Sequence, residues 1–226
     1  MKVFAVVPVY NEKIEIVNKI VSELLDFVDK VVVVDDGSRY SVKEAVFRCK
    51  KNTGKIVCLC HQINRGQGAA LQTGTDYAFL SGADIVVHFD GDGQHLATDV
   101  LALTGPIKKG QVEFVFGSKV LGRAENIPWS KKTFIIPLAR FVNRILTGIN
   151  LSDAHNGLRA FNRRAGDKIN LSQDRMAHNT EYPYLVKKNN LKYKEVPVKV
   201  IYNQYGQGIG GGIRILKELI LGWLLK

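Results

Sequence analysis

The sequence predicts an α/β fold in which helices flank a mostly parallel β-sheet. Two observations support this prediction. Short apolar runs, too uniform to be exposed on either face, alternate with segments of helical periodicity, and polar clusters follow several of these runs. Strands that alternate with helices are joined by right-handed crossovers, which make neighbouring strands parallel. Ligands of such sheets bind at the carboxyl ends of the strands.

The first half of the chain supplies the predicted elements in order. Strands are expected at residues 3–9, 30–35, 55–60 and 84–90, and helices at 12–28, 41–51 and 66–81. In the first helix, Ile16, Ile20 and Leu24 recur at helical spacing. The second strand (KVVVVD) is continuously apolar, as expected of a strand covered on both faces. We predict one domain over residues 1–203, followed by a separate segment, 204–226.

Positive charge is concentrated in the second half of the chain. The formal net charge is +11; residues 1–118 hold 13 Lys+Arg and 14 Asp+Glu, whereas residues 119–226 hold 19 and 7. This asymmetry indicates an anionic partner such as lipid headgroups or phosphates, the alternative being a solubilising surface. Nucleic acid is not the expected partner, because no aromatic residues interleave with a basic face.

The cysteines and the apolar runs indicate the compartment. Cys49, Cys58 and Cys60 give neither a disulfide framework nor zinc-ligand spacing, so reduced thiols in a cytosolic protein are expected. The first residues do not form a signal peptide. No stretch reaches the roughly 20 apolar residues of a spanning helix, so we expect no integral membrane protein.

The cluster Asp90-Gly91-Asp92-Gly93-Gln94 follows the fourth predicted strand. Two carboxylates two residues apart suit Mg²⁺ or Mn²⁺, and the Gln94 amide oxygen is a further candidate ligand. The glycines let the backbone turn sharply and approach a ligand. Such an ion would stabilise the charge on a departing diphosphate. Solvated turn residues are the alternative interpretation.

Two further clusters each have two interpretations. Asp35-Asp36-Gly37-Ser38 either forms an Asx turn that caps the next helix or binds a nucleobase or ribose through one carboxylate. The glycine-rich segment around Arg65 (NRGQG, 64–68) precedes a predicted helix. It is either a diphosphate site at the helix N-terminus or a simple loop.

Taken in order, the segments VVPVYNE, VVVVDDGS, NRGQGAALQTG, DGDGQH, GSK and NGLRAF resemble the family 2 glycosyltransferases of the GT-A fold. The likeness is strongest to the branch of dolichyl-phosphate mannose synthase and polyprenyl-phosphate sugar transferases, and covers roughly residues 2–202. It implies a Rossmann-like GT-A domain. It also implies an inverting transfer from a UDP-, GDP- or dTDP-sugar to a polyprenyl phosphate or lipid-linked acceptor.

The resemblance also implies roles for individual residues. On the donor side, it implies a nucleotide pocket lined by Pro8, Tyr10 and Glu12. It further implies that Asp36 contacts the base and Asp90 the ribose. Asp92 and Gln94 would hold the metal. Asp35, Arg65 and Gly91 complete the candidate donor site.

The candidate catalytic residues are Asp92, Lys119, Arg159 and Glu181. Lys119 stands where the family often has Arg, Lys131 and Lys132 lie in a phosphate-binding region, Arg159 matches the acceptor-side element and Glu181 faces the active-site region.

The nature of the acceptor depends on whether the enzyme needs a general base. A hydroxyl acceptor needs one within hydrogen-bond reach, whereas a lipid phosphate is already anionic. The chain lacks the Q-x-x-R-W motif of many hydroxyl-directed relatives, which favours a phosphate. Transfer to a sugar hydroxyl in surface-polysaccharide or glycolipid synthesis, with Glu181 or Asp153 as the base, is the alternative.

The C-terminal segment bears on localisation. Residues 213–226 place Ile213, Leu216, Ile220 and Trp223 on one helical face, which predicts an amphipathic helix in the headgroup region of a membrane. Docking on its own domain, or on a second protomer of a homo-oligomer, is the alternative. The resemblance implies a lid over the donor at residues 202–212. We expect a cytoplasmic protein, peripheral on the inner face of the membrane.

Overall fold

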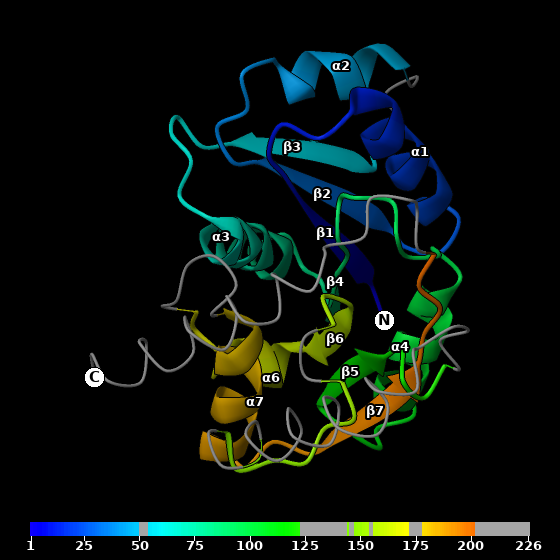
Figure 1. Cartoon of the computed structure of the whole chain (residues 1–226), viewed down its shortest axis with the longest axis vertical. Coiled ribbons are helices and arrows are strands. Elements are labelled where there is room, and N and C mark those ends of the chain that lie inside the picture. The colour runs from blue at the N-terminus through cyan, green and yellow to red at the C-terminus, as the bar shows by residue number, and fades with distance from the viewer. Residues whose placement is uncertain (50–53, 123–143, 145–146, 154–155, 172–177, 202–226) are drawn as a thin grey trace, which may run out of the picture.

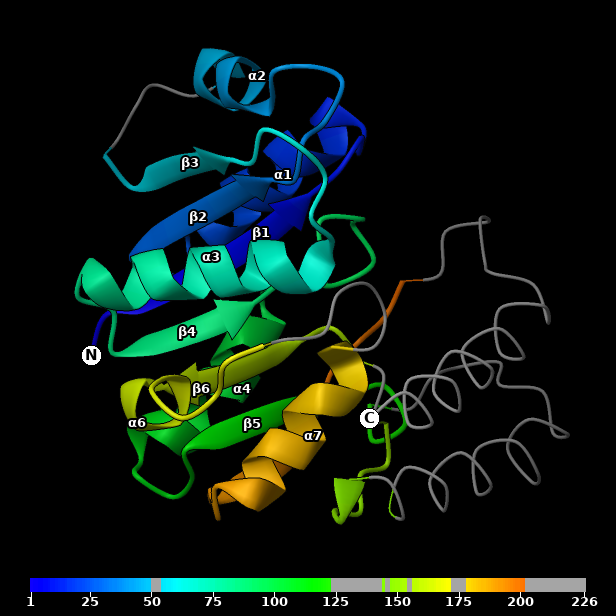
Figure 2. The ribbon, with the colours of Figure 1, turned by 90° about the vertical axis from the view of Figure 1, so that its left-hand side faces the viewer.

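One mixed seven-stranded sheet runs through the molecule, and helices cover both of its faces (Figures 1 and 2). The computed structural model describes residues 1–49, 54–122, 144, 147–153, 156–171 and 178–201. The strands are β1 (Val3–Val9), β2 (Lys30–Asp35), β3 (Ile56–Cys60), β4 (Ile85–His88), β5 (Phe114–Ser118), β6 (Arg159–Asn162) and β7 (Tyr193–Pro197). The helices are α1 (Ile14–Leu24), α2 (Val42–Cys49), α3 (Gln67–Leu80), α4 (Asp99–Lys108), α6 (Arg163–Gly166) and α7 (His178–Lys188).

The strands lie in the order β3-β2-β1-β4-β6-β5-β7. β3, β2, β1 and β4 are parallel neighbours, β6 is antiparallel to both β4 and β5, and β7 is parallel to β5. β6 is therefore the one reversed strand of this sheet. Its first residue lies at the edge where β4 and β5 end, because His88 pairs with Arg159 and Phe116 also pairs with Arg159.

Alternation along β1 and β2 divides the core between the two faces of the sheet. Ala5, Val7 and Val33 face the side covered by α1, α2 and α4. Phe4 and Val6 face the side covered by α3, α6 and α7. Figure 2 shows α3 and α7 lying across this second face. Both faces are covered, which explains why the strands are continuously apolar.

The structure confirms all seven elements predicted for residues 3–90; β1 and β2 have the predicted bounds, and the described parts of the other five are shorter. The fourth strand ends at His88 instead of residue 90, so Asp90 stands in the loop beyond it. The three strands and three helices that the structure describes after residue 98 (β5, β6, β7, α4, α6 and α7) are not among the predicted elements. The predictions for residues 204–226, for the 202–212 loop and for Lys131 and Lys132 concern residues outside the described part of the chain.

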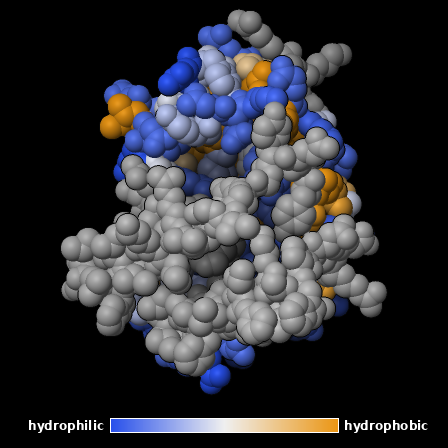
Figure 3. Space-filling model, in the orientation of Figure 1, coloured by the Kyte–Doolittle hydropathy of each residue, from blue (hydrophilic) through white to orange (hydrophobic). Residues whose placement is uncertain are grey.

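Among the described residues, no helix combines the length and the hydrophobicity that crossing a bilayer requires. On the face seen in Figure 3, the described surface around α2 is mostly hydrophilic and is interrupted by small apolar patches.

Candidate active site

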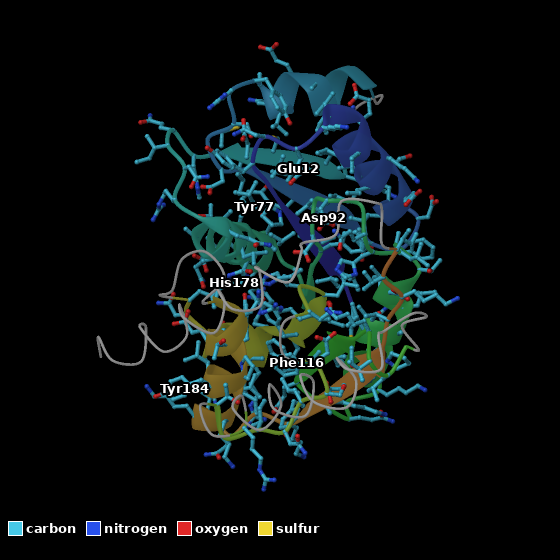
Figure 4. The ribbon with its side chains drawn as sticks, viewed as in Figure 1. Glu12, Tyr77, Asp92, Phe116, His178 and Tyr184 are labelled. Atoms are coloured by element: carbon cyan, nitrogen blue, oxygen red, sulfur yellow. The ribbon has the colours of Figure 1, made fainter. Side chains whose placement is uncertain are left out.

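The carboxyl edge of the sheet gathers the polar clusters that the sequence singled out. β1, β2 and β4 are parallel, so the loops that follow them, carrying Glu12, Asp36 and Asp92, meet at one edge. Glu12 and Asp92 both lie there (Figure 4). β5 ends at Ser118, which places Lys119 at the same edge, and the reversed strand β6 begins there with Arg159.

The loop after β4 makes a tight turn that presents Asp92. The Asp92 Oδ1 atom accepts a hydrogen bond from the Gln94 backbone N–H at 3.0 Å, and Gly93 has a φ of +76°, which favours glycine. Gly91 is buried, and a Cβ atom there would lie 2.8 Å from the Pro8 carbonyl oxygen. Glycine at position 91 therefore lets this turn pack against the end of β1.

The carboxylates of Glu12 and Asp92, at this edge of the sheet, repel each other. Burial, and then the charge of Asp92, raise the pKa of Glu12. Burial also raises the pKa of Asp92; the Gln94 backbone N–H offsets part of this shift, and the charge of Asp90 adds to it. A cation placed near Glu12 and Asp92 would relieve this repulsion.

The oxygen donors at this turn fit a hard divalent cation. Carboxylate and amide oxygens are available from Asp92 and Gln94, and Mg²⁺ prefers such ligands. Within the described part of the chain, no three His, Cys, Asp or Glu side chains converge as a ready-made metal site. Mg²⁺ characteristically uses one or two carboxylates together with substrate phosphates, so the donor set suits an ion that binds with its substrate.

Asp90, in the loop after β4, is contacted by three residues from different parts of the chain. Gln67 Nε2 donates to Asp90 Oδ1 at 3.0 Å, and His95 Nε2 lies 3.4 Å from Oδ2. Gly157 lies against the same carboxylate, since a Cβ atom there would come within 1.8 Å of Oδ2. Burial raises the pKa of Asp90, but His95, by hydrogen bond and charge, and then Arg159 hold it below its usual value. Asp90 is therefore an anion with 22% of its side chain exposed.

Asp36 is buried and binds the loop that follows β3. Its Oδ1 accepts the Arg65 backbone N–H at 2.9 Å and lies 2.7 Å from His61 Nδ1, while Oδ2 accepts the Gly66 backbone N–H at 2.8 Å. His61 Nε2 in turn lies 3.0 Å from Thr73 Oγ1 on α3. The carboxylate that the resemblance assigns to the base thus also fixes the shape of the glycine-rich loop.

The neighbouring Asp35 closes a turn with its side chain, through the third residue on instead of the second residue of an Asx turn. Its Oδ1 accepts the Ser38 backbone N–H at 2.9 Å. The following helix is capped by a different residue, because Ser41 Oγ accepts the Glu44 backbone N–H at 3.2 Å. Asp35 therefore closes the turn without capping the helix, and a ligand contact from this cluster stays a prediction.

The glycine-rich segment leads directly into α3. Gly66 has a φ of +95° and precedes the first helical residue, Gln67. Two backbone N–H groups that could serve a phosphate, those of Arg65 and Gly66, are already hydrogen-bonded to Asp36. The Arg65 side chain itself is exposed. The negative group beside the start of this helix is thus the protein's own carboxylate, as the helix dipole favours.

The loop after β1 is pinned to the loop after β2. The Asn11 backbone N–H donates to Ser38 Oγ at 3.0 Å, and Asn11 Oδ1 accepts the Arg39 backbone N–H at 3.0 Å. The Tyr40 hydroxyl donates to the Glu12 carbonyl oxygen. Pro8 lies within β1 and Tyr10 is 48% exposed beyond it, so Tyr10 is free to contact a ligand.

A second network lies on the side of the sheet assigned to the acceptor. Asp153 is 9% exposed; its Oδ2 accepts the Lys119 backbone N–H at 3.1 Å, and its Oδ1 lies 3.9 Å from Lys119 Nζ. Both carboxylate oxygens of Glu195 accept the Ser152 backbone N–H, at 2.8 and 2.9 Å. Glu195 on β7 therefore holds the segment that positions Asp153, and Asp153 positions Lys119.

Arg159 and Glu181 occupy different environments. Arg159 is 1% exposed, and its Nη2 donates to Asn179 Oδ1 at 2.5 Å. Glu181 lies in the first turn of α7 and is partly exposed. His178, which begins that helix, is buried; its position relative to the strands is seen in Figure 4.

Sequence reasoning did not identify four residues that organise this site. Gln67 and His95 contact Asp90, Gly157 packs against it, and Glu195 holds the segment around Ser152. Gln67, His95 and Gly157 lie inside the segments NRGQGAALQTG, DGDGQH and NGLRAF, so their place in those motifs was the available signal. Glu195 had none, because its partner is 43 residues away in the sequence.

Comparison with known proteins gives concordant results. The family described as "Glycosyl transferase family 2" matches residues 4–169. An uncharacterised protein of Methanocaldococcus jannaschii is 36% identical, over 97% of this chain and 91% of its own. The UDP-N-acetylglucosamine–dolichyl-phosphate N-acetylglucosaminyltransferase of Methanococcus voltae is 33% identical, over 94% of this chain and 91% of its own.

Among solved structures, glucosyl-3-phosphoglycerate synthase from Mycobacterium tuberculosis, in complex with Mn²⁺ and UDP, superposes with a TM-score of 0.65. It is 21% identical, and the match covers 94% of this chain and 76% of that one. At this identity the likeness concerns the fold, which is of the GT-A type.

Proposed function

Because the chain belongs to glycosyl transferase family 2 and is a glycosyltransferase, we propose that it transfers a sugar from a nucleotide-sugar to a polyprenyl phosphate at a membrane surface. The observation that carries the choice of acceptor is the Lys119–Asp153 pair. In this pair the Asp153 carboxylate is buried and engaged, whereas the Lys119 side chain is 36% exposed at the side of the edge next to β5.

The donor half of the proposal is supported by the acidic edge. Tyr10 and Glu12 follow β1 and Asp90 follows the parallel neighbour β4, so their loops are adjacent at this edge. Asp36 shapes the glycine-rich loop that follows β3. Asp90 retains some exposure and a lowered pKa, so it is an ionised acceptor suited to the hydroxyls of a ribose. The relative from Methanococcus voltae is named for a UDP-sugar donor, which makes UDP the first nucleotide to test.

The acceptor half is supported by the state of Asp153. A general base needs an available lone pair aimed at the proton that it removes. Asp153 is buried, accepts the Lys119 backbone N–H and faces the Lys119 ammonium, so it is poorly placed for that role. A phosphate acceptor needs no base and would be attracted by Lys119. The named dolichyl-phosphate relative is consistent with this choice.

The proposed reaction is a single displacement. An oxygen of the lipid phosphate attacks the anomeric carbon from the face opposite the nucleotide, the carbon–oxygen bond to the diphosphate breaks, and the configuration inverts. A divalent ion, held by Asp92 and Gln94, would supply charge stabilisation for the departing diphosphate. Lys119 would hold the attacking phosphate, and Asp90 with Tyr10 would orient the nucleoside.

Donor and metal are tested together by thermal unfolding. UDP, GDP and dTDP are each added with Mn²⁺, with Mg²⁺ or with EDTA to wild type, to Asp92→Ala and to Asp76→Ala. A ligand that binds only the folded state raises Tm by mass action. We expect one nucleotide to raise Tm with a metal, in wild type and in Asp76→Ala, whose carboxylate is exposed on α3. Equal shifts in Asp92→Ala would contradict the metal assignment, and no shift with any nucleotide would contradict the donor site.

The acceptor is tested by turnover with a polyprenyl phosphate and with the corresponding polyprenol. We expect only the phosphate to accept sugar. Lys119→Ala should raise KM for it by roughly tenfold, the effect of losing one charged contact, whereas Lys188→Ala should not. Lys188 is the matched control because it is exposed in the last turn of α7. Transfer to a sugar hydroxyl that is abolished in Glu181→Gln with intact nucleotide binding would instead establish the alternative reaction.

A further inference from the structure

The turn from Asn156 to Arg159 lies directly against the donor carboxylate. Arg159 on β6 pairs with His88 on β4. His88 precedes Asp90 by two residues, so the start of β6 lies next to the Asp90 loop. A Cβ atom on Gly157 would lie 1.8 Å from Asp90 Oδ2 and 2.4 Å from Cγ. A side chain at position 157 would therefore displace the Asp90 carboxylate from its present position.

Asp90 has little freedom to move away from such a side chain. Gln67 Nε2 donates to its Oδ1 at 3.0 Å, and His95 Nε2 lies 3.4 Å from its Oδ2. Displacing the carboxylate would break or lengthen both contacts. The Gly157 backbone thus packs directly against the Asp90 carboxylate. The position of this backbone depends on the contacts that hold the turn.

Arg159 holds this turn from inside the protein. Its Nε donates to the Gly157 carbonyl oxygen at 3.2 Å, and its Nη2 donates to the Asn156 carbonyl oxygen at 2.8 Å. The same Nη2 donates to Asn179 Oδ1 at 2.5 Å, and the guanidinium lies over the Tyr182 ring, 4.2 Å from its centroid. These contacts fasten the turn to α7.

The burial of Arg159 excludes a direct contact with substrate in this conformation. Its exposed fraction is 1%, and its Nη1 is buried with no hydrogen-bond partner among the described residues. Burying a guanidinium with incomplete hydrogen bonding destabilises the folded state. A hydrophobic side chain of similar size at position 159 would therefore give a more stable protein if stability were its only role. The bonds that Arg159 does make are directed at the two carbonyl oxygens of the turn.

We propose that Arg159 and Gly157 are positioning residues for the donor: Arg159 fixes the turn, and the turn fixes the Asp90 carboxylate. This rests on the proposed function, in which Asp90 binds the nucleoside. Arg159, assigned to the acceptor side by resemblance, thereby acts on the donor without touching it. The reversed strand β6 makes this possible, because it brings the start of one strand beside the end of another.

The chain offers a matched control arginine four residues along. Arg163 Nη2 donates to the carbonyl oxygens of Phe79 and Ala83, at 2.6 and 3.1 Å, and its guanidinium lies over the Phe79 ring at 5.1 Å. Arg163 thus makes the same kinds of contact as Arg159, two main-chain carbonyls and one aromatic face. Those carbonyls lie at the opposite edge of the sheet from the site, between α3 and the start of β4.

The first experiment measures nucleotide affinity by calorimetry. The nucleoside diphosphate that binds wild type is titrated, with its metal, into Arg159→Met, Arg159→Lys and Arg163→Met. We expect Kd to rise on the order of tenfold in Arg159→Met, as for a misaligned charged contact, and less in Arg159→Lys. Arg163→Met should lower Tm while leaving Kd unchanged. Wild-type affinity in Arg159→Met, or an equal loss in Arg163→Met, would overturn the proposal.

If Arg159→Met does not fold, Asn179→Ala removes one partner of the same guanidinium and should also raise Kd. A second experiment needs no ligand. Gly157→Ala is made alone and in an Asp90→Ala background, and Tm is measured for each. We expect a clear loss of Tm in wild type and a much smaller one in Asp90→Ala, because the clash is then removed.

The two experiments separate the two proposals. Equal losses of Tm in both backgrounds would overturn the contact between Gly157 and Asp90, and with it the positioning role. A wild-type protein that binds no nucleotide would instead contradict the donor site. In that case a non-additive cycle would still establish that the turn sets the position of Asp90.

Discussion

His88 illustrates how single residues behind the site are locked in one protonation state. Thr75 Oγ1 donates to the Leu71 carbonyl oxygen at 2.8 Å, so it must accept the proton of His88 Nε2, 2.8 Å away. His88 Nδ1 is then the acceptor for the Tyr182 hydroxyl at 3.1 Å. Burial, and then the charges of Arg159 and His178, hold the pKa of His88 well below its usual value. The ring is therefore neutral in the folded protein.

This neutrality predicts an acid-dependent loss of stability. As pH falls below about 6.5, the ordinary pKa of histidine, His88 becomes protonated in the unfolded chain but stays neutral in the folded protein. His88 should therefore contribute a loss of up to about 1.4 kcal/mol per pH unit. In His88→Gln, the free energy of unfolding, measured by urea titration from pH 7 to 5, should fall less steeply with acidity. The same slope in both proteins would contradict a neutral His88.

Site residues were predictable where a short polar motif follows a buried strand. Asp92 and Glu12 met this condition, and the parallel strands bring them together. Secondary roles were not predictable, since they depend on contacts distant in sequence. Asp36 looked like a ligand contact or a cap, yet it also binds the backbone of a loop 29 and 30 residues further on.

At the scale of elements, the first half of the fold was predictable and the second half was not. β1 and the four central residues of β2 (31–34) are continuous apolar runs, and burial on both faces imposes that composition. β6 has only four residues, and β7 buries only Val196 fully, so neither gives a clear pattern. α4 and α7 contain Pro106 and Pro183, which obscure their helical character. The reversed strand also breaks the simple alternation of strand and helix.

The packing of α3 on the sheet depends on one glycine. A Cβ atom on Gly74 would lie 2.3 Å from Val6 Cγ1 and 3.0 Å from Val34 Cγ2. Glycine weakens an isolated helix, so its use here reflects the close approach of α3 to β1 and β2. Since α3 also carries Gln67 at its first position, the seating of this helix bears on Asp90.

Replacement of this glycine should therefore be destabilising. Gly74→Ala is expected to lower the free energy of unfolding by about 1–3 kcal/mol, the usual effect of overpacking. Asp76, exposed on the same helix, is the matched control, because its side chain points away from the sheet contact made by Gly74. Asp76→Ala should change the free energy of unfolding by no more than about 0.5 kcal/mol, as is usual for a surface substitution. Chemical denaturation measures both, and equal effects would show that Gly74 does not set the approach of α3.

For the whole molecule, charge is distributed unevenly between the two halves of the chain. Residues 119–226 carry 19 Lys+Arg and 7 Asp+Glu, whereas the first 118 residues are nearly balanced. Glu12, Asp36, Asp90 and Asp92 belong to the balanced half. The half of the chain that is proposed to meet a lipid phosphate is the basic one, which suits an anionic bilayer surface.

This asymmetry predicts salt-sensitive binding to anionic membranes. In co-sedimentation, the protein should bind vesicles containing about one third phosphatidylserine more tightly than pure phosphatidylcholine vesicles. Raising salt from 0.05 to 0.5 M should weaken this binding, since screening shortens the reach of surface charges. Binding that is equal for both lipids and insensitive to salt would show that the basic half serves another partner.

The hydrogen bond that the Gly117 backbone N–H donates to the Leu158 carbonyl oxygen, at 2.9 Å, closes a narrow neck. The chain leaves the sheet after Ser118 and re-enters it at Arg159, on the adjacent antiparallel strand. The sheet thus holds the chain together on both sides of residues 119–155, while Asn156 and Gly157 belong to the Asp90 side of the site. If Lys119 and Asp153 select the acceptor, as proposed, residues 119–155 are an exchange unit. Swapping only these residues between relatives should then change the acceptor and leave the Kd for the nucleotide unchanged.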